Sequence, residues 1–297
     1  MLDYKLLHAF SVVVDEQNFA KAASVLAITQ SAVSQRIKML EQTIGQPVLV
    51  RAQPLVATSI GKKLLAHYQQ VKLLEQDILP DISANTQAET ITANIASNAD
   101  SLATWLITAI SDVCHQYNVA VNFRLADENR TINYLKDGEV FGAISTHAQA
   151  LPGCTLEKLG DMHYLLVAAP SFVKSYFPNG INERSLARAP AVAYDQKDDM
   201  HIKYIEQTFG LKGGSYPCHT VRSSEAFVGF AKQGLAYCLI PKLQIQAELA
   251  SGKLIDLMPE NTITRTLYWH HWVLLKGVFK AFSKAIIYRA QQALKNQ

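Results

Sequence analysis

The stretch from residue 29 to residue 45 constrains this chain more than any other part of its sequence. Apolar side chains recur there at steps of four, three and four residues, which is the spacing of a helix that buries one face. They are Val33, Ile37, Leu40 and Ile44. The opposite face carries hydroxyl, amide and basic side chains, and its residues are Ser31, Ser34, Gln35 and Lys38. Such groups hydrogen-bond base edges and phosphates in a DNA major groove, so the stretch predicts a recognition helix that ends at Gly45.

Two shorter helices precede this one. Residues 4–14 show the same helical spacing, and Asn18 is placed to cap a second helix that buries Ala22 and Ala23. Residues 27–29 leave room only for a tight connection, so the three segments predict a helix-turn-helix. The alternative reading is a small helical bundle whose polar face is merely exposed to solvent. We expect DNA contacts from Gln30, Ser31, Ser34, Gln35, Arg36, Lys38 and Arg51.

A short hairpin and a long helix follow the predicted recognition helix. Residues 47–51 and 56–58 are extended runs on either side of Pro54, which predict a wing with Arg51 placed to touch a phosphate. Residues 59–82 form a helical pattern with a narrow apolar stripe of Leu64, Tyr68, Val71, Leu74 and Ile78. Such a helix between two domains suggests a dimer-forming linker, and packing against its own chain is the alternative.

Charge supports a nucleic-acid partner only through its distribution. The whole chain carries a net charge of +3, but residues 18–63 hold six basic residues and one acidic residue, a local balance of six minus one, or +5. A solvated basic face explains the same numbers, so the cluster supports the helix-turn-helix without proving it.

Composition bounds the function classes. The length of 297 residues suggests two or three domains, and 49% apolar with 18% charged residues is ordinary for a globular protein. No apolar run approaches the roughly 18 residues of a membrane span, and the start carries no secretory signal, so we expect a cytoplasmic protein with no membrane partner. The cysteines and histidines are scattered, and no catalytic motif is present. We therefore expect no metal, no cofactor and no catalytic residues.

Residues 90–297 alternate short apolar strands with helical patterns. The predicted strands are residues 90–96, 119–125, 142–145, 164–168, 191–194 and 236–240. This alternation predicts an α/β fold with mainly parallel sheets, and about 200 residues allow two such subdomains.

Polar residues follow several of these strands, where open α/β sheets bind ligands. Ser97, Asn98, Asp100 and Ser101 precede a helical run and can hold a carboxylate or simply cap the helix. Asp127 and Glu128 follow another strand and suit a basic side chain, against the alternative of a solvated helix start. The weaker candidates, each able to cap a helix or hold a ligand, are Ser145, Thr146, Ser223 and Ser224.

The order of motifs resembles the LysR-type transcriptional regulators. The resemblance is carried by Phe19-Ala20-Lys21-Ala22-Ala23, by the run from Thr29 to Lys38, and by Gly45, Pro47, Arg51, Thr58 and Gly61. It continues along essentially the whole chain, and Asn98-Ala99-Asp100, Pro217-Cys218-His219 and Tyr268-Trp269-His270 are similar to stretches of the arginine- and lysine-responsive branch of the family. Two parts depart from the pattern. The wing segment 54–57 lacks a second arginine that would contact a phosphate, and the tail after Trp272 diverges.

The resemblance implies a three-part organisation. Residues 1–58 would form an all-α winged helix-turn-helix and residues 59–89 a linker helix and hinge. Residues 90–297 would form an effector domain like a periplasmic binding protein, with subdomain I at 90–163 and 267–297 and subdomain II at 164–266.

The resemblance also implies partners. They are a double-stranded operator with inverted half-sites, a second copy paired through the linker helix, a tetramer, RNA polymerase, and lysine or arginine as effector. The implied target genes serve amino-acid export or metabolism. The alternatives are a regulator with another small effector or, from a different class, a solute-binding protein, which would have no use for residues 1–61.

Overall fold

The computed structural model describes residues 2–50, 52, 54–82, 90–195 and 199–295. The N-terminal unit is built from α1 (Tyr4–Glu16), α2 (Phe19–Val25) and α3 (Gln30–Ile44), followed by the hairpin β1 (Leu49–Val50) and β2 (Val56–Ala57). The three helices pack around a core that includes Leu7, Phe10 and Ile37, each fully buried. The sequence predictions of three helices and a short antiparallel wing are confirmed.

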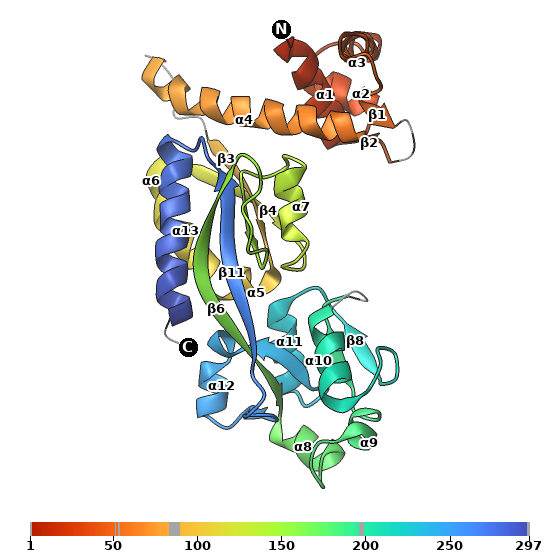
Figure 1. Cartoon of the computed structure of the whole chain (residues 1–297), viewed down its shortest axis with the longest axis vertical. Helices are drawn as coiled ribbons and strands as arrows, with labels where there is room; N and C mark the ends of the chain where they lie inside the picture. The colour runs from red at the N-terminus through yellow and green to blue at the C-terminus, as the bar shows by residue number, and fades with distance from the viewer. Residues whose placement is uncertain (1, 51, 53, 83–89, 196–198, 296–297) are drawn as a thin grey trace.

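Helix α4 (Ser59–Ile82) runs across the molecule between the N-terminal unit and the rest of the chain (Figure 1). Its predicted bounds are confirmed. Leu64 belongs to the core of the N-terminal unit, whereas Leu73 packs against the core of the C-terminal region. Gly138 allows a second close approach of α4 to this region, because a Cβ atom there would lie 2.1 Å from the Cα of Ala66. Part of the α4 stripe is therefore used within the chain.

The C-terminal region is organised around one seven-stranded sheet. The strands are β3 (Ile91–Ser97), β4 (Val119–Leu125), β5 (Gly142–Ser145), β6 (Cys154–Ala168), β9 (Cys238–Pro241), β10 (Ile255–Asp256) and β11 (Ile263–Trp272). Their order is β10-β6-β11-β5-β3-β4, and β9 pairs with β6. The long strands β6 and β11 lie side by side and run through both halves of this region (Figure 1).

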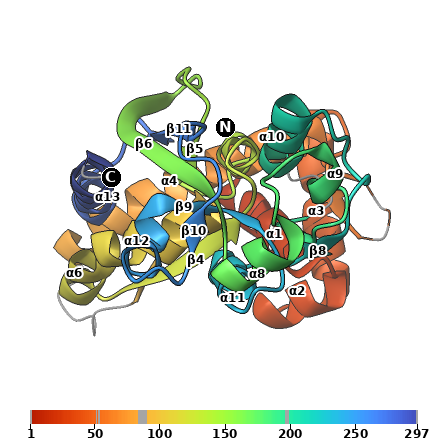
Figure 2. The same cartoon turned by 90° about the horizontal axis from the view of Figure 1, so that it is seen from below.

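Helices cover the upper half of the sheet, which we call subdomain I. They are α5 (Ala99–Ser101), a π-helical turn (Leu102–Leu106) that continues into α6 (Ile107–Tyr117), α7 (Thr131–Lys136) and α13 (Gly277–Lys295). Seen from below, α6 and α13 flank one side of the molecule (Figure 2). Trp269, Phe279 and Phe282 fill the core between the sheet and α13. The Trp269 indole also donates a 2.8 Å hydrogen bond from Nε1 to Ser283 Oγ.

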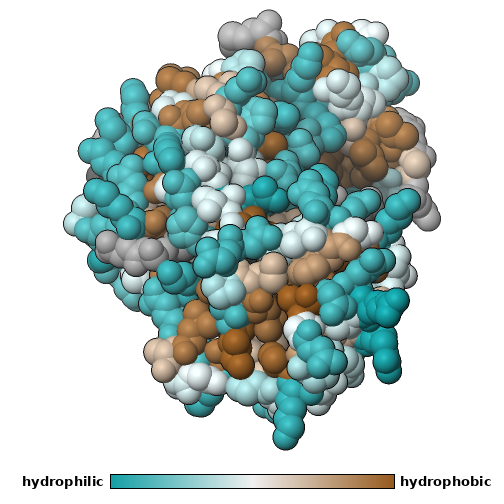
Figure 3. Space-filling model, turned by 60° about the horizontal axis from the view of Figure 1, so that its bottom comes forward, coloured by the Kyte–Doolittle hydropathy of each residue, from teal (hydrophilic) through white to brown (hydrophobic). Residues whose placement is uncertain are grey.

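The lower half, subdomain II, contains a second, parallel pair of strands, β7 (Ala191–Ala193) and β8 (Cys218–Thr220). Its helices are α8 (Pro170–Tyr176), α9 (Glu183–Leu186), α10 (Asp199–Phe209), α11 (Ser224–Lys232) and α12 (Gln246–Ala250), with a 3₁₀ turn at Lys242–Gln244. The surface seen from this lower side is mostly hydrophilic, with apolar side chains gathered in patches (Figure 3). Within the described residues, no helix combines the length and the apolar composition of a membrane span.

The predicted α/β fold is confirmed, but the expectation of mainly parallel sheets is wrong. β3 pairs in parallel with β4 and β5, whereas β6 pairs antiparallel with β9, β10 and β11. The physical reason is that the chain leaves subdomain I along β6 and returns along β11 in the opposite direction. The first half of β6 was missed because Glu157, Lys158 and Asp161 interrupt its apolar pattern.

Candidate nucleic-acid interface and ligand cleft

Local sequence fixes the position of α3. The side chain of Thr29 accepts a hydrogen bond from Ala32 N at 3.2 Å and caps the first turn, and Gly45 ends the helix with a left-handed φ of 79°. Val33 and Ile37 are fully buried against α1 and α2. The buried face thus holds the helix in the orientation that the apolar spacing predicts.

The opposite face of α3 is open to solvent. Gln30, Ser31, Ser34, Gln35 and Lys38 are all exposed, and Arg36 is half-buried. Figure 1 shows α3 on the outer side of the N-terminal unit, away from both subdomains. The structure therefore brings six of the seven predicted DNA contacts to one accessible helix. The seventh, Arg51, lies outside the described residues.

The wing is tied to the helices by polar contacts. Val48 N donates to Glu41 Oε1 at 3.1 Å, and Thr58 Oγ1 donates to the Pro47 carbonyl at 2.9 Å. Gly61 fits this junction because a Cβ atom would lie 2.2 Å from Val48 O. The motif residues Pro47, Thr58 and Gly61 thus serve to hold the wing beside α3.

The basic residues of the segment 18–63 do not all face the same part of the molecule. Lys21, Lys38 and Lys63 are exposed on the N-terminal unit, but Lys62 Nζ pairs with Asp137 Oδ2 of subdomain I at 2.5 Å. Lys62 therefore faces the C-terminal region, which lowers the charge that this cluster offers to DNA.

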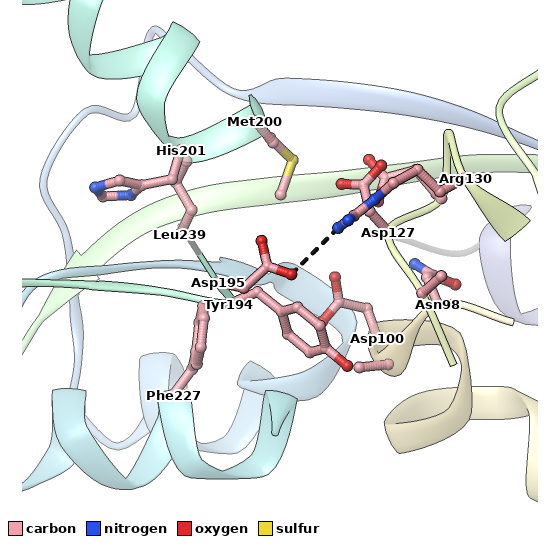
Figure 4. A pocket seen from close by; sticks show the side chains of 13 residues that line it. Asn98, Asp100, Asp127, Arg130, Tyr194, Asp195, Met200, His201, Phe227 and Leu239 are labelled. Atoms are coloured by element: carbon pink, nitrogen blue, oxygen red, sulfur yellow. Dashed lines mark hydrogen bonds and ion pairs between the residues drawn. The ribbon is translucent and has the colours of Figure 1, made fainter. Parts of the chain in front are cut away.

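A cleft lies between the two subdomains, with about 550 Å³ of empty space including the part open to solvent. Four predicted effector residues line it, and they are Asn98, Asp100, Asp127 and Glu128. Ala99, Ala126 and Arg130 complete the side formed by subdomain I. Tyr194, Asp195, Met200, His201, Phe227 and Leu239 form the facing side (Figure 4).

Asp100 connects the two sides of the cleft. Its Oδ2 accepts a 2.8 Å hydrogen bond from Tyr164 on β6, and its Oδ1 accepts a 2.6 Å hydrogen bond from Ser224 at the start of α11. Burial and the neighbouring Asp100 carboxylate raise the pKa of Tyr164 far above its ordinary value, so the phenol stays a donor. Asp100 therefore acts as a bridge between the subdomains as well as a lining acid.

Glu128 is a buried carboxyl group. Only 5% of the residue is exposed, and burial, reinforced by the nearby Asp127 charge, raises its pKa to about 7. Its Oε1 has no hydrogen-bond partner among the described residues and lies 3.9 Å from Arg265 Nε. Both polar side-chain atoms of the buried Asn98 are likewise without a hydrogen-bond partner in the described part of the chain. Buried groups of this kind are completed by a ligand or by water.

The remaining predicted effector residues do not line the cleft. Ser97 and Ser101 are fully buried beside it, and Ser145 donates to the Glu128 carbonyl at 2.8 Å. Thr146 donates to Asn129, and Ser223 caps α11 by accepting from Ala226 N. Ser145 and Thr146 thus hold the loop that carries Glu128, and Ser223 holds the first turn of α11.

An ion pair across the cleft was missed from the sequence. Arg130 Nη2 of subdomain I lies 3.3 Å from Asp195 Oδ2 of subdomain II (Figure 4). Asp195 directly follows the strand predicted at 191–194, so the rule that singled out Asp127 would have found it. Tyr194, Met200, Phe227 and Leu239 carry no comparable signal, because apolar and aromatic residues line cores and clefts alike.

The cleft is chemically suited to a cation. Its lining contains four acidic side chains, of which Glu128 has a pKa raised to about 7, and, within the described residues, one basic side chain, Arg130. His201 adds no charge at neutral pH, since burial lowers its pKa to about 4, and its ring points away from the Arg130–Asp195 pair (Figure 4). A ligand with an amino or guanidinium group finds an excess of carboxylates here.

Two family models match the chain. Residues 4–62 match the bacterial regulatory helix-turn-helix protein, lysR family, and residues 87–273 match the LysR substrate binding domain. The second match contains every residue that lines the cleft.

Individual proteins resemble the chain over nearly its full length. The HTH-type transcriptional regulator ArgP of Aeromonas salmonicida is 52% identical over 293 residues, covering 99% of this chain and 98% of the relative. The crystal structure of ArgP from Mycobacterium tuberculosis superposes with a TM-score of 0.83 at 32% identity, covering 98% of each chain. Full-length LysG from Corynebacterium glutamicum with bound effector Arg gives a TM-score of 0.78 at 30% identity, covering 98% of this chain and 99% of LysG.

Proposed function

The chain belongs to the LysR family of bacterial transcriptional regulators, and from this premise we propose that it controls transcription in response to lysine or arginine bound in the cleft. The observation that carries the effector class is the lining of four acidic side chains and one guanidinium. A basic amino acid presents two cationic groups and one carboxylate, which matches this charge pattern. The arginine named in the LysG structure supports the same class.

The DNA-binding role rests on the exposed face of α3. Two chains related by a two-fold axis would place two such helices in successive major grooves, so the operator is an interrupted inverted repeat. We assign the pairing of chains to α4. Val71 and Leu74 support this assignment, because both are half-exposed and belong to neither of the two cores that α4 touches.

Effector binding must then change how the chains are arranged. A ligand shifts this equilibrium only if it binds one arrangement better than the other. We place that difference in the closure of the two subdomains, which alters the tetramer, DNA bending and contact with RNA polymerase. The regulatory output serves export or metabolism of the effector.

Fluorescence anisotropy tests this function directly. Operator DNA obtained by selection is titrated with the full-length protein at fixed salt, with and without lysine or arginine. The proposal expects specific binding whose affinity or stoichiometry changes with either amino acid. The Asp127→Asn/Glu128→Gln double variant should bind the operator normally but lose this response. Specific binding that ignores both amino acids would refute the effector class and leave the regulator standing.

A further inference from the structure

An ion pair between Arg130 and Asp195 spans the cleft. Arg130 lies between β4 and α7 in subdomain I, and Asp195 follows β7 in subdomain II, so their 3.3 Å contact joins the two walls. The Asp195 side chain is only 13% exposed, whereas that of Arg130 is 41% exposed. The carboxylate is therefore the more enclosed member of the pair, and the guanidinium is the more accessible one.

The contact between Arg130 and Asp195 resembles the contact that a bound arginine would make with Asp195. A guanidinium on a flexible stem contacts a largely buried carboxylate, which is the contact that the distal group of arginine would make in the same cleft. The other lining acids are engaged differently. Both oxygens of Asp100 accept hydroxyl hydrogen bonds, Asp127 Oδ1 accepts a 2.9 Å hydrogen bond from Asn129 N, and Glu128 Oε1 lies 3.9 Å from Arg265 Nε.

Resting on the proposed function, we propose that the effector enters by exchanging this ion pair. The carboxylate of the amino acid takes Arg130, and its distal cation takes Asp195. One internal ion pair is lost and two are gained, so that Arg130 and Asp195 each keep a partner of opposite charge. Tight binding therefore requires the carboxylate of the effector, because this carboxylate is the new partner of Arg130.

The carboxylate is required because a ligand without it leaves the charge of Arg130 without a ligand partner. A cation without a carboxylate can displace Arg130 from Asp195, but it brings no anion of its own to pair with the freed guanidinium. Among the described residues that line the cleft, no lysine or arginine other than Arg130 could anchor a carboxylate. An anion anchored elsewhere in the cleft would face an excess of negative charge.

Isothermal titration calorimetry with L-arginine and agmatine, its decarboxylated analogue, tests the exchange. The wild-type full-length protein should bind arginine about tenfold or more tightly than agmatine, as loss of one charge-assisted pair requires. In Arg130→Gln the arginine affinity should fall, and the ratio between the two ligands should close to about threefold or less. Arg130→Lys keeps the charge and should retain most of the preference.

Arg222→Gln is the matched control. Arg222 also approaches Asp195, at 3.6 Å, but its side chain is 73% exposed and does not line the cleft. This variant should keep the wild-type ratio between arginine and agmatine. Operator binding by each variant, measured without ligand, confirms that the fold is intact.

A second comparison tests the other half of the exchange. Citrulline has the shape of arginine without the distal charge, so wild type should discriminate against it. Asp195→Asn should shrink the arginine-to-citrulline ratio by about tenfold. A wild-type ratio in both Arg130→Gln and Asp195→Asn would overturn the exchange and leave the proposed function intact. Wild-type protein that binds neither arginine nor lysine would overturn both.

Discussion

At the scale of single residues, Glu128 is the least ordinary side chain of the cleft, because it is an acidic group that is almost completely buried. Its carboxyl group is buried beside Asp127 and Asp100, and this environment favours the protonated form. A sequence reading identifies Glu128 as a candidate because it follows a strand. It does not reveal that the side chain turns inward, since that depends on how β4 and α7 pack.

The raised pKa of Glu128 predicts a pH dependence of stability. The folded protein keeps the proton up to about pH 7, whereas the unfolded chain loses it near its ordinary value of 4.5. The unfolded state therefore binds fewer protons in this window, and the contribution of Glu128 to stability falls as the pH rises from about 4.5 to about 7.

Glu128→Gln removes this contribution. We expect the variant and wild type to have similar stability near pH 4, and the variant to gain up to roughly 3 kcal/mol over wild type at pH 8. Urea denaturation of both proteins at four pH values between 4 and 8 measures the difference. Two parallel stability profiles would show that the carboxyl group titrates normally.

At the scale of elements, the helices of the N-terminal unit were predicted well and the sheet was not. Spacing, the Asn18 and Thr29 caps and Gly45 are local signals, so α1, α2, α3 and α4 follow from short stretches of sequence. The pairing of β6 with β11 joins residues about a hundred positions apart, and no local pattern encodes it. The apolar and aromatic residues of the facing wall were missed because they resemble core residues, whereas Asp195 carries the same local signal as Asp127.

Helix α3 supports a prediction about sequence readout. Gln35→Ala should weaken specific operator binding by roughly 1 to 3 kcal/mol and leave nonspecific DNA binding nearly unchanged, because an amide on the exposed face reads a base edge. Gln42→Ala is the matched control, since Gln42 is exposed on the same helix near its C-terminal end. Anisotropy on operator and scrambled DNA at one salt concentration compares them, and an equal loss on both DNAs would contradict base readout.

At the scale of the whole molecule, α4 joins the DNA-reading unit to subdomain I through close contacts. Lys62 pairs with Asp137, and the backbone at Gly138 lies against Ala66. The ion pair is partly exposed and contributes little to stability. The close approach at Gly138 limits how α4 can pack against subdomain I.

Two glycine substitutions separate packing from backbone strain. Gly138 and Gly153 have similar left-handed φ angles of 76° and 74°, but a Cβ atom at Gly153 meets nothing within 4 Å. Gly153→Val should cost only the conformational strain, about 1 to 2 kcal/mol. Gly138→Val should cost roughly 1 to 3 kcal/mol more, because α4 must move away. Thermal denaturation of the two variants measures this difference, and equal losses would show that the contact is not maintained in solution.

Because β6 and β11 lie side by side, one continuous segment that forms part of the cleft can be exchanged as a unit. Met162 on β6 and Arg265 on β11 are register partners where the chain passes between the subdomains, so the segment between them enters and leaves at adjacent points. That segment supplies Asp195 and the rest of one wall, while Arg130 stays on the other. A chimaera that receives residues 163–264 of a relative with another effector should acquire a new preference for the side chain while still requiring the carboxylate. Calorimetry of such a chimaera with amino acids and their decarboxylated amines would show whether one transplant redirects what the regulator senses and leaves its operator unchanged.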